Sequence, residues 1–345
     1  MKVTLTNEIL SYITEIEHNR YKVSSVKLSK PVMNRLRKNS KKKSSYASNK
    51  IEGNPLSEKQ VDEVIERDER KHYLKPEQEV RNYFLALNYL EEKVSKKEKF
   101  SQKLILDVQK LVEKGASKEK IGLRGSMPPG VLFAVYDSKT GNPDYIPPEY
   151  CDIPELLDEL VEYVNTTDDH PLIVAAVVHY QLVTIHPFED GNGRTARLLS
   201  GYIMDLNGYG FNGIGSLEEY FAYDIDEYYE SIQMGLPALY YSGRENPPHP
   251  EIWINYFLRM VKLYSGKVCD LQLASEEEDI AGSLSFLKGK EKELLQFLIR
   301  NYRGEFTPIE VSRELSVSNK TVINRLAVLV KNGFAVPVFA NQRIR

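Results

Sequence analysis

Residues 186–197, near the middle of the chain, constrain its fold more than any other segment. They read H-P-F-E-D-G-N-G-R-T-A-R and join an apolar stretch, residues 171–185, to a second periodic stretch, residues 194–207. Apolar side chains recur at helical spacing in both stretches, and the glycines between them permit a tight turn. The sequence therefore predicts two helices that meet at a glycine-rich loop.

This loop has the parts of an anion-binding site. Unpaired N–H groups at a helix start favour an anion, and Gly191 and Gly193 let the backbone approach a phosphate. Arg194 and Arg197 lie three residues apart, so both project from the first turn of the helix and suit phosphate oxygens. Asp190 is a suitable ligand for Mg²⁺, which usually bridges a carboxylate and substrate phosphates. Such parts favour phosphoryl or nucleotidyl transfer.

His186 is the best candidate for a general base, because the reference pKa of histidine lies near neutrality. The alternative role is that of a histidine that merely caps the preceding helix. His179, seven residues earlier, is more typical of a core or hydrogen-bonded histidine. Phe188 is expected to anchor the loop by packing, and Glu189 is an alternative to Asp190 as the carboxylate that holds the metal.

The pattern H-x-F-x-[D/E]-G-N-G-R-x-x-R resembles the signature of the Fic family, whose members move a nucleotide monophosphate onto protein hydroxyls. The resemblance implies that ATP and Mg²⁺ bind here and that AMP passes to a Tyr, Thr or Ser hydroxyl of a target protein, with loss of pyrophosphate. It assigns the base to His186 and the metal ligand to Asp190. It assigns nucleotide contacts to the rest of the motif: Gly191, Asn192, Gly193, Arg194, Thr195, Ala196 and Arg197. It also places a tyrosine pair, Tyr228 and Tyr229, beside the adenine; for one of these two tyrosines, packing in the core is an equally open role.

Helical periodicity dominates the chain, with one exception at residues 131–146. There an apolar run, a turn-rich segment and a second short run, closed by Pro147 and Pro148, predict a β-hairpin. The fold class is therefore mainly α with one hairpin. This hairpin resembles the flap of Fic proteins, which aligns the target segment by strand addition.

A second short motif lies upstream. Residues 48–53 read S-N-K-I-E-G, which by themselves predict a helix end followed by a glycine C-cap. They match the inhibitory pattern [S/T]-x-x-x-E-[G/N] of Fic proteins that carry an N-terminal inhibitory helix, formed here by Ser48, Glu52 and Gly53. The resemblance implies that Glu52 pairs with Arg197 and takes it from the γ-phosphate of ATP. It also leaves open a bifunctional enzyme that removes AMP.

The C-terminal end of the chain has a different charge. Residues 286–345 contain 11 Lys+Arg and 5 Asp+Glu, which gives them a net charge of +6. Because the whole chain has a net charge of −3, residues 1–285 have a net charge of −9. Residues 308–315 and 319–332 have helix-turn-helix spacing, and residues 334–345 suit a β-wing with Arg343 and Arg345. This part resembles a winged-helix domain. Contact with DNA or with protein is equally open. The alternative function of the whole chain is a nucleotide-sensing, DNA-binding transcriptional regulator, which only this C-terminal part favours.

We therefore expect four regions: residues 1–95 with the inhibitory motif, 96–245 with the catalytic core, a helical connector at 246–285, and the winged helix at 286–345. Cys151 and Cys269 are too few and too far apart for a disulfide framework or a zinc site. The ligands of an all-histidine or two-histidine zinc site are missing, which argues against a metal hydrolase. No apolar run suits a signal peptide or a membrane span, so a cytoplasmic protein is expected. Monomer and homodimer both remain open.

Overall fold

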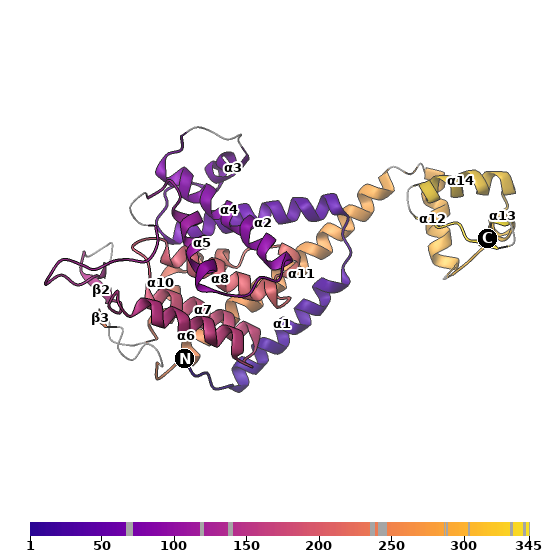
Figure 1. Ribbon diagram of the computed structural model, residues 1–345. Helices are drawn as coiled ribbons and strands as arrows, with labels where there is room; N and C mark the ends of the chain where they lie inside the picture. Colours follow the sequence, from indigo (N-terminus) through magenta and orange to yellow (C-terminus); the bar gives the residue numbers. More distant parts are fainter. Residues whose placement is uncertain are drawn as a thin grey trace. The chain divides into compact units, whose positions relative to one another are not determined.

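The computed structural model describes residues 1–66, 72–117, 121–136, 141–234, 239–240, 247–285, 287, 289–302, 304–331, 334–340 and 343–344. The chain divides into two compact units, Met1–Leu273 and Ala274–Arg345. The first unit is built from helices around one core, with a small β-sheet (Figure 1). The expectation of a mainly α fold with one hairpin in this region is confirmed.

The helices of the first unit are α1 (Asn7–Ser25), α2 (Lys30–Ile51), α3 (Glu58–Glu66), α4 (Lys75–Ser95), α5 (Gln102–Glu113), α6 (Ile153–Thr166), α7 (Pro171–Ile185), α8 (Asn192–Leu206), α9 (Glu218–Phe221), α10 (Ile225–Gln233) and the first part of α11 (Glu251–Ser285), with a 3₁₀ turn η1 (Phe211–Gly213). Among these described segments, no helix is both long and apolar enough to cross a membrane.

Helices α7 and α8 form the centre of this unit (Figure 1). Pro171 suits the first turn of α7, where the His170 ring accepts a hydrogen bond from the Leu172 amide. Every residue from Leu172 to Leu182 is buried, so α7 is apolar on all sides and is covered by other helices. The loop that follows α7 is therefore placed by a helix that is buried along most of its length.

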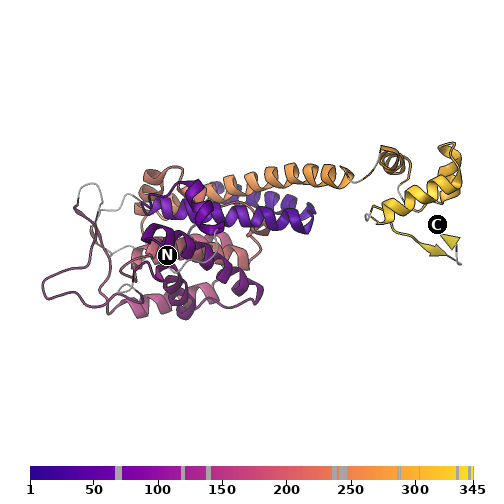
Figure 2. The same cartoon turned by 90° about the horizontal axis from the view of Figure 1, so that it is seen from above.

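Helices α1 and α2 lie beside the first part of α11, as the view from above shows (Figure 2). The Asn19 amide of α1 donates to the Ser265 hydroxyl of α11 at 3.0 Å. In α11, Trp253 is fully buried and its indole N–H donates to the Ala176 carbonyl of α7 at 2.8 Å. The start of α11 is thus part of the same core as the motif helices.

The hairpin consists of β1 (Val135–Tyr136) and β2 (Pro143–Ile146), which pair antiparallel with Val135 opposite Tyr145. β3 (Leu239–Tyr240) pairs in parallel with β2, which gives the order β1-β2-β3. The Tyr145 hydroxyl donates to the Thr184 carbonyl in the last turn of α7. The hairpin therefore stands at the end of α7, next to the motif; residues 137–140 of the expected flap lie outside the described residues.

Two helices differ from the expected bounds. The helical periodicity of residues 220–232 predicts one helix, but the chain forms α9 and α10, because Asp224 leaves helical geometry at φ −134° and caps α10 through the Glu227 amide at 2.9 Å. The periodicity of residues 252–264 predicts a helix that in the structure continues to Ser285 as α11. The expected boundaries at 245/246 and at 286 fall outside the described residues, so the four-region division remains a prediction.

The second unit contains the end of α11, α12 (Gly289–Asn301), α13 (Pro308–Glu314), α14 (Asn319–Lys331) and a two-stranded ladder of β4 (Phe339–Ala340) and β5 (Arg343–Ile344). Thr307 and Glu310 form a capping box at the start of α13. The core holds Leu294, Leu298, Val311, Val322 and Leu329 among other apolar residues. The winged helix remains a prediction, and Arg345 lies outside the described residues.

Candidate active site

A cavity of about 180 Å³ opens where α7 ends and α8 begins. It is lined by the inhibitory motif, the hairpin, the central loop and α10: Glu52, Val135, Tyr145, Val183, Thr184, His186, Asn192, Gly193, Arg197, Tyr228, Tyr229, Ile232 and Gln233. Its volume is below the roughly 300–1,000 Å³ of most ligand pockets. Four segments that are distant in sequence therefore meet at one small cavity, and several of the residues expected at the site line it.

His186 ends α7 in the left-handed conformation, at φ +49° and ψ +58°. Its Nδ1 lies 3.3 Å from the Val183 carbonyl oxygen. Because a carbonyl only accepts, Nδ1 carries the proton and Nε2 keeps its lone pair. Burial lowers the pKa of His186 to about 4. The imidazole is therefore neutral at physiological pH, as a general base must be.

The glycine-rich loop is held by its own side chains. Gly191 caps α8 at φ +82°, a conformation that glycine adopts without strain. The Asn192 amide exchanges two hydrogen bonds with Phe188, at 3.0 and 2.9 Å. Phe188 is fully buried beneath the loop. Asn192 thus lines the cavity and also fixes the shape of the loop. The resemblance implies only a nucleotide contact for this residue.

Arg197 is bound by both polar residues of the inhibitory motif. Its Nη2 lies 2.6 Å from Glu52 Oε1 and 3.0 Å from the Ser48 carbonyl, and its Nε donates to the Ser48 hydroxyl at 2.8 Å. Burial alone would lower the pKa of Arg197, but the Glu52 carboxylate raises it. Gly53 follows α2 at φ +79° and ends the helix directly after Glu52. The pairing of Glu52 with Arg197 expected from the resemblance is present in the structure.

The absence of a side chain at Gly193 lets the Glu52 carboxylate lie at this position. A Cβ on Gly193 would lie 2.5 Å from Glu52 Oε1 and 3.2 Å from Arg197 Nη1. Only a residue without a side chain leaves this space open at the start of α8. An anionic oxygen from the protein itself therefore lies against Gly193 and Arg197, where the sequence predicts an anion from a ligand.

Arg194 lies elsewhere. Its Nη2 is 2.9 Å from Glu113 Oε1 and 3.2 Å from Asp190 Oδ1, its side chain is 3% exposed, and it is not among the residues that line the cavity. Glu113 is fully buried, and burial raises its pKa to about 7 although Arg194 lowers it. Sequence reasoning missed Glu113, because a glutamate at the end of an amphipathic helix carries no local signal of such a partner.

Asp190, the expected metal ligand, accepts hydrogen bonds at Oδ1 from the Gly191 amide and from Arg194. Its side chain is 28% exposed, so it is accessible to solvent, although it does not line the cavity. In the described part of the chain, no cluster of three or more His, Cys, Asp or Glu side chains suits a metal ion. A single accessible carboxylate fits a Mg²⁺ ion whose other ligands are substrate phosphates and water, and it does not fit an all-protein zinc site.

The tyrosine pair of α10 has two different environments. The Tyr228 hydroxyl is 2.7 Å from His179 Nε2 and 3.4 Å from Arg197 Nη1, and the residue is 1% exposed. Tyr229 is 45% exposed. Both rings line the cavity and lie 5.1 Å apart. Burial lowers the pKa of His179 far below its usual value, so His179 is a neutral core histidine that binds Tyr228.

Five predicted site residues of the central motif do not line the cavity: Asp190, Gly191, Arg194, Thr195 and Ala196. Thr195 and Ala196 are buried on the core side of α8, and neither lines the cavity. Arg194, Thr195 and Ala196 are thus placed to support the loop, whereas His186, Gly193 and Arg197 face the space that a ligand would enter.

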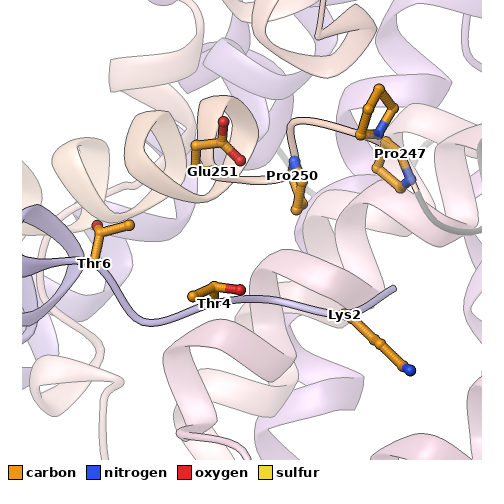
Figure 3. A pocket seen from close by; sticks show the side chains of 7 residues that line it. Lys2, Thr4, Thr6, Pro247, Pro250 and Glu251 are labelled. Carbon is orange, nitrogen blue, oxygen red and sulfur yellow. The ribbon is translucent and has the colours of Figure 1, made fainter.

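A separate cavity of about 440 Å³ lies between the N-terminal segment and the start of α11 (Figure 3). Lys2, Thr4 and Thr6 face it from one side, and Pro247, Pro250 and Glu251 from the other. It has the larger volume, but its few polar side chains do not converge on one point. The cavity beside His186 is therefore the candidate active site.

Comparison with known proteins agrees with this geometry. Residues 56–204 match the sequence profile of the Fic/DOC family. The protein adenylyltransferase fic-1 of Caenorhabditis elegans is 46% identical over 67 residues, 19% of this chain and 13% of that protein. The protein adenylyltransferase Fic of Drosophila grimshawi is 27% identical over 206 residues, 57% of this chain and 40% of that protein. The chain thus spans less than half the length of these curated relatives.

Solved structures share the fold. A Fic family protein from Desulfovibrio desulfuricans superimposes with a TM-score of 0.63 at 20% identity, over 96% of this chain and 91% of the other. Residues 134–508 of C. elegans Fic-1 give a TM-score of 0.60 at 24% identity, over 78% and 73%. Residues 56–204 of this chain therefore form a domain of the Fic/DOC family.

Proposed function

We propose that this chain is a protein adenylyltransferase that transfers AMP from ATP to a Tyr, Thr or Ser hydroxyl of a target protein, and that Glu52 restrains it. The observation that carries the proposal is that a neutral imidazole, an arginine and an open glycine face one cavity. The names of the curated relatives support the same activity.

In the proposed reaction the target hydroxyl oxygen attacks the α-phosphorus of ATP. Its proton passes to His186 Nε2, the bond between the α-phosphorus and the bridging oxygen breaks, and pyrophosphate leaves with the bonding electrons. The Val183 carbonyl keeps the proton on Nδ1 and so directs Nε2 toward the cavity. Asp190 would hold Mg²⁺, which neutralises charge on the phosphates when it is bound.

The restraint follows from competition for one arginine. The Glu52 carboxylate lies against Arg197 and Gly193, and a triphosphate needs the same cation and the same space. While Glu52 stays there, the nucleotide binds without its outer phosphate on Arg197, and its α-phosphorus is not in line with the hydroxyl. Removal of the Glu52 side chain frees both groups.

The hairpin supplies the surface for the target. Among the described strands, β1 lies at the edge of the sheet, and Val135 of β1 lines the cavity. An extended segment of the target that pairs with this edge would bring its hydroxyl toward His186.

The test is incubation with radiolabelled ATP and Mg²⁺, scored by label on the protein itself and on bound targets. We expect the Glu52→Gly variant to be labelled at least tenfold more than wild type, and the Glu52→Gly, His186→Ala variant not at all. Glu92→Gly is the matched control, because Glu92 also lies in the last turn of a helix and pairs with a cation, Lys96, away from the cavity. Absence of label on the Glu52→Gly variant would refute the proposal.

DNA binding by the second unit is a separate candidate function. It is favoured by the net charge of +6 in residues 286–345 and by the exposed Lys320 and Asn324 on α14. A gel shift that weakens with salt and disappears on deletion of residues 286–345 would support it. Equal retention by the truncated chain would contradict it.

A further inference from the structure

Arg124 lies between the motif loop and the base of the hairpin, and it is 5% exposed. We infer that Arg124 is a positioning residue for the transfer reaction: its guanidinium holds the His186 backbone in the conformation that directs the imidazole into the cavity, and it ties that backbone to the hairpin. The inference rests on the proposed function, because it concerns the same site.

The first set of contacts joins Arg124 to the motif. Arg124 Nε donates to the His186 carbonyl at 2.9 Å, and the Arg124 backbone N–H donates to the Pro187 carbonyl at 2.9 Å. The preceding residue, Leu123, forms an antiparallel bridge with Phe188. Three consecutive motif residues are thus bound by residues 123 and 124.

These contacts act where the backbone needs support. His186 has φ +49°, and the left-handed region is unfavourable for any residue with a Cβ. Such a conformation persists only when its surroundings determine it. The His186 carbonyl is fixed by Arg124 Nε, and the direction of the imidazole depends on the same backbone angles.

The second set of contacts joins Arg124 to the hairpin. Its Nη2 donates to the Pro148 carbonyl, just after β2, and its guanidinium carbon lies 4.8 Å above the Phe133 ring, just before β1. The Phe133 ring centroid is 6.0 Å from that of His186. A planar guanidinium with several donors makes these contacts at once, whereas a lysine ammonium on its flexible stem does not reproduce them.

Arg124 acts through His186 and does not touch the ligand space, since it is not among the residues that line the cavity. Burial is the main cause that lowers the pKa of the His186 imidazole, and the positive charge of Arg124 lowers it further. The carboxylates of Glu52 and Asp190 raise this pKa. Loss of Arg124 should therefore slow the chemical step and leave nucleotide affinity nearly unchanged.

The experiment uses the full chain with Glu52→Gly, so that activity is measurable. In that background we would compare Arg124→Ala, Arg124→Lys and the control Arg37→Ala; Arg37 Nε also donates to a backbone carbonyl, that of Asn212, away from the cavity. We expect kcat to fall about 100-fold for Arg124→Ala, the size of effect that misplacement of a catalytic group produces. Arg124→Lys should recover part of the loss, and Arg37→Ala should have no effect.

Three measurements separate positioning from folding: the Kd for ATP by calorimetry, the melting temperature, and an NMR titration of the His186 imidazole in the wild-type background. We expect the Kd to change by less than about threefold in both variants. The pKa of His186 should rise in Arg124→Ala, which removes a cation, and should change less in Arg124→Lys, which keeps the charge. Unchanged kcat and unchanged His186 titration would overturn the inference. A fall in kcat matched by loss of ATP binding or folding in both variants would also overturn it. Failure of the Glu52→Gly parent to transfer AMP refutes the proposed function instead, and the NMR titration then still tests Arg124.

Discussion

Glu52 Oε1 lies 2.6 Å from Arg197 Nη2, although the two residues are 145 positions apart in the sequence. The contact joins the inhibitory motif to the last residue of the central motif. It fills the space beside Gly193, where a bound anion would lie. Four predictions test this arrangement and the groups around it.

Gly193→Ala tests the space itself. In the Glu52→Gly background we expect ATP affinity to fall by about 5- to 150-fold, because the new Cβ occupies the space against Arg197 Nη1, and overpacking of this kind costs about 1–3 kcal/mol. Calorimetric titration with ATP and Mg²⁺ measures it. Gly201→Ala, in the same helix with open space around the new Cβ, is the control and should bind ATP normally.

Ser48→Ala tests the hold on Arg197 apart from the carboxylate. The Ser48 hydroxyl accepts from Arg197 Nε at 2.8 Å, and a hydrogen bond to a charged group contributes about 1.5–3 kcal/mol. We therefore expect automodification between the wild-type and Glu52→Gly levels. Ser45→Ala, which loses a hydroxyl from the same helix that binds only the Lys41 carbonyl, should stay at the wild-type level. Equal labelling of the two serine variants would show that Ser48 takes no part in the restraint.

The pH dependence of transfer tests the protonation state of His186. Burial lowers its pKa to about 4, and a general base must be unprotonated. For the Glu52→Gly variant, kcat/KM should be flat from about pH 8 down to pH 5 and should fall as the pH drops through about 4. Because Glu52 raises this pKa, its removal should shift the fall to lower pH still. A midpoint between pH 6 and 7 would mean that the imidazole is exposed to water in the active enzyme.

Tyr228→Phe tests the buried contact behind Arg197. The change leaves His179 Nε2 without its partner at 2.7 Å, and an unsatisfied buried polar group costs about 1–3 kcal/mol. Denaturant unfolding should report that loss of stability. Tyr229→Phe removes a hydroxyl from the exposed neighbour and should cost less than about 0.5 kcal/mol. Similar losses in the two variants would contradict the role of the His179 contact.

Much of this site can be predicted from sequence because its signals are local. The two central helices, the loop between them, and the glycine after Glu52 all follow from short-range patterns. The hairpin follows from an interruption of helical periodicity. Such features need no knowledge of what lies across the fold.

The groups that were missed depend on distant partners. Glu113 and Arg124 gain their significance from Arg194 and His186, which lie 81 and 62 residues away. Arg194 itself was expected at the phosphates, but the buried carboxylate of Glu113 holds it in the core. No pattern within α5 or before the hairpin contains this information.

Helix α2 was missed for a different reason. Its buried face is mostly polar, so it has no apolar stripe: Ser40, Lys42, Ser44, Ser45, Ala47, Ser48, Asn49 and Ile51. Periodicity of apolar residues is the main sequence signal of a helix, and here the buried positions carry hydroxyls and charges instead. Only the last turn, with its motif, was recognisable.

That polar face has a consequence for how the restraint is released. Lys42 forms ion pairs with Asp62 and Glu66, and the Ser44 hydroxyl donates to the buried Glu218. Helix α2 is therefore held by polar contacts that water can replace. Among the buried side chains of α2 itself, only those of Ala47 and Ile51 are apolar, so a detached α2 carries a smaller aggregation hazard than a helix with an apolar stripe. We expect α2 to detach and rebind with its polar face hydrated, and we expect its attachment to weaken as ionic strength rises.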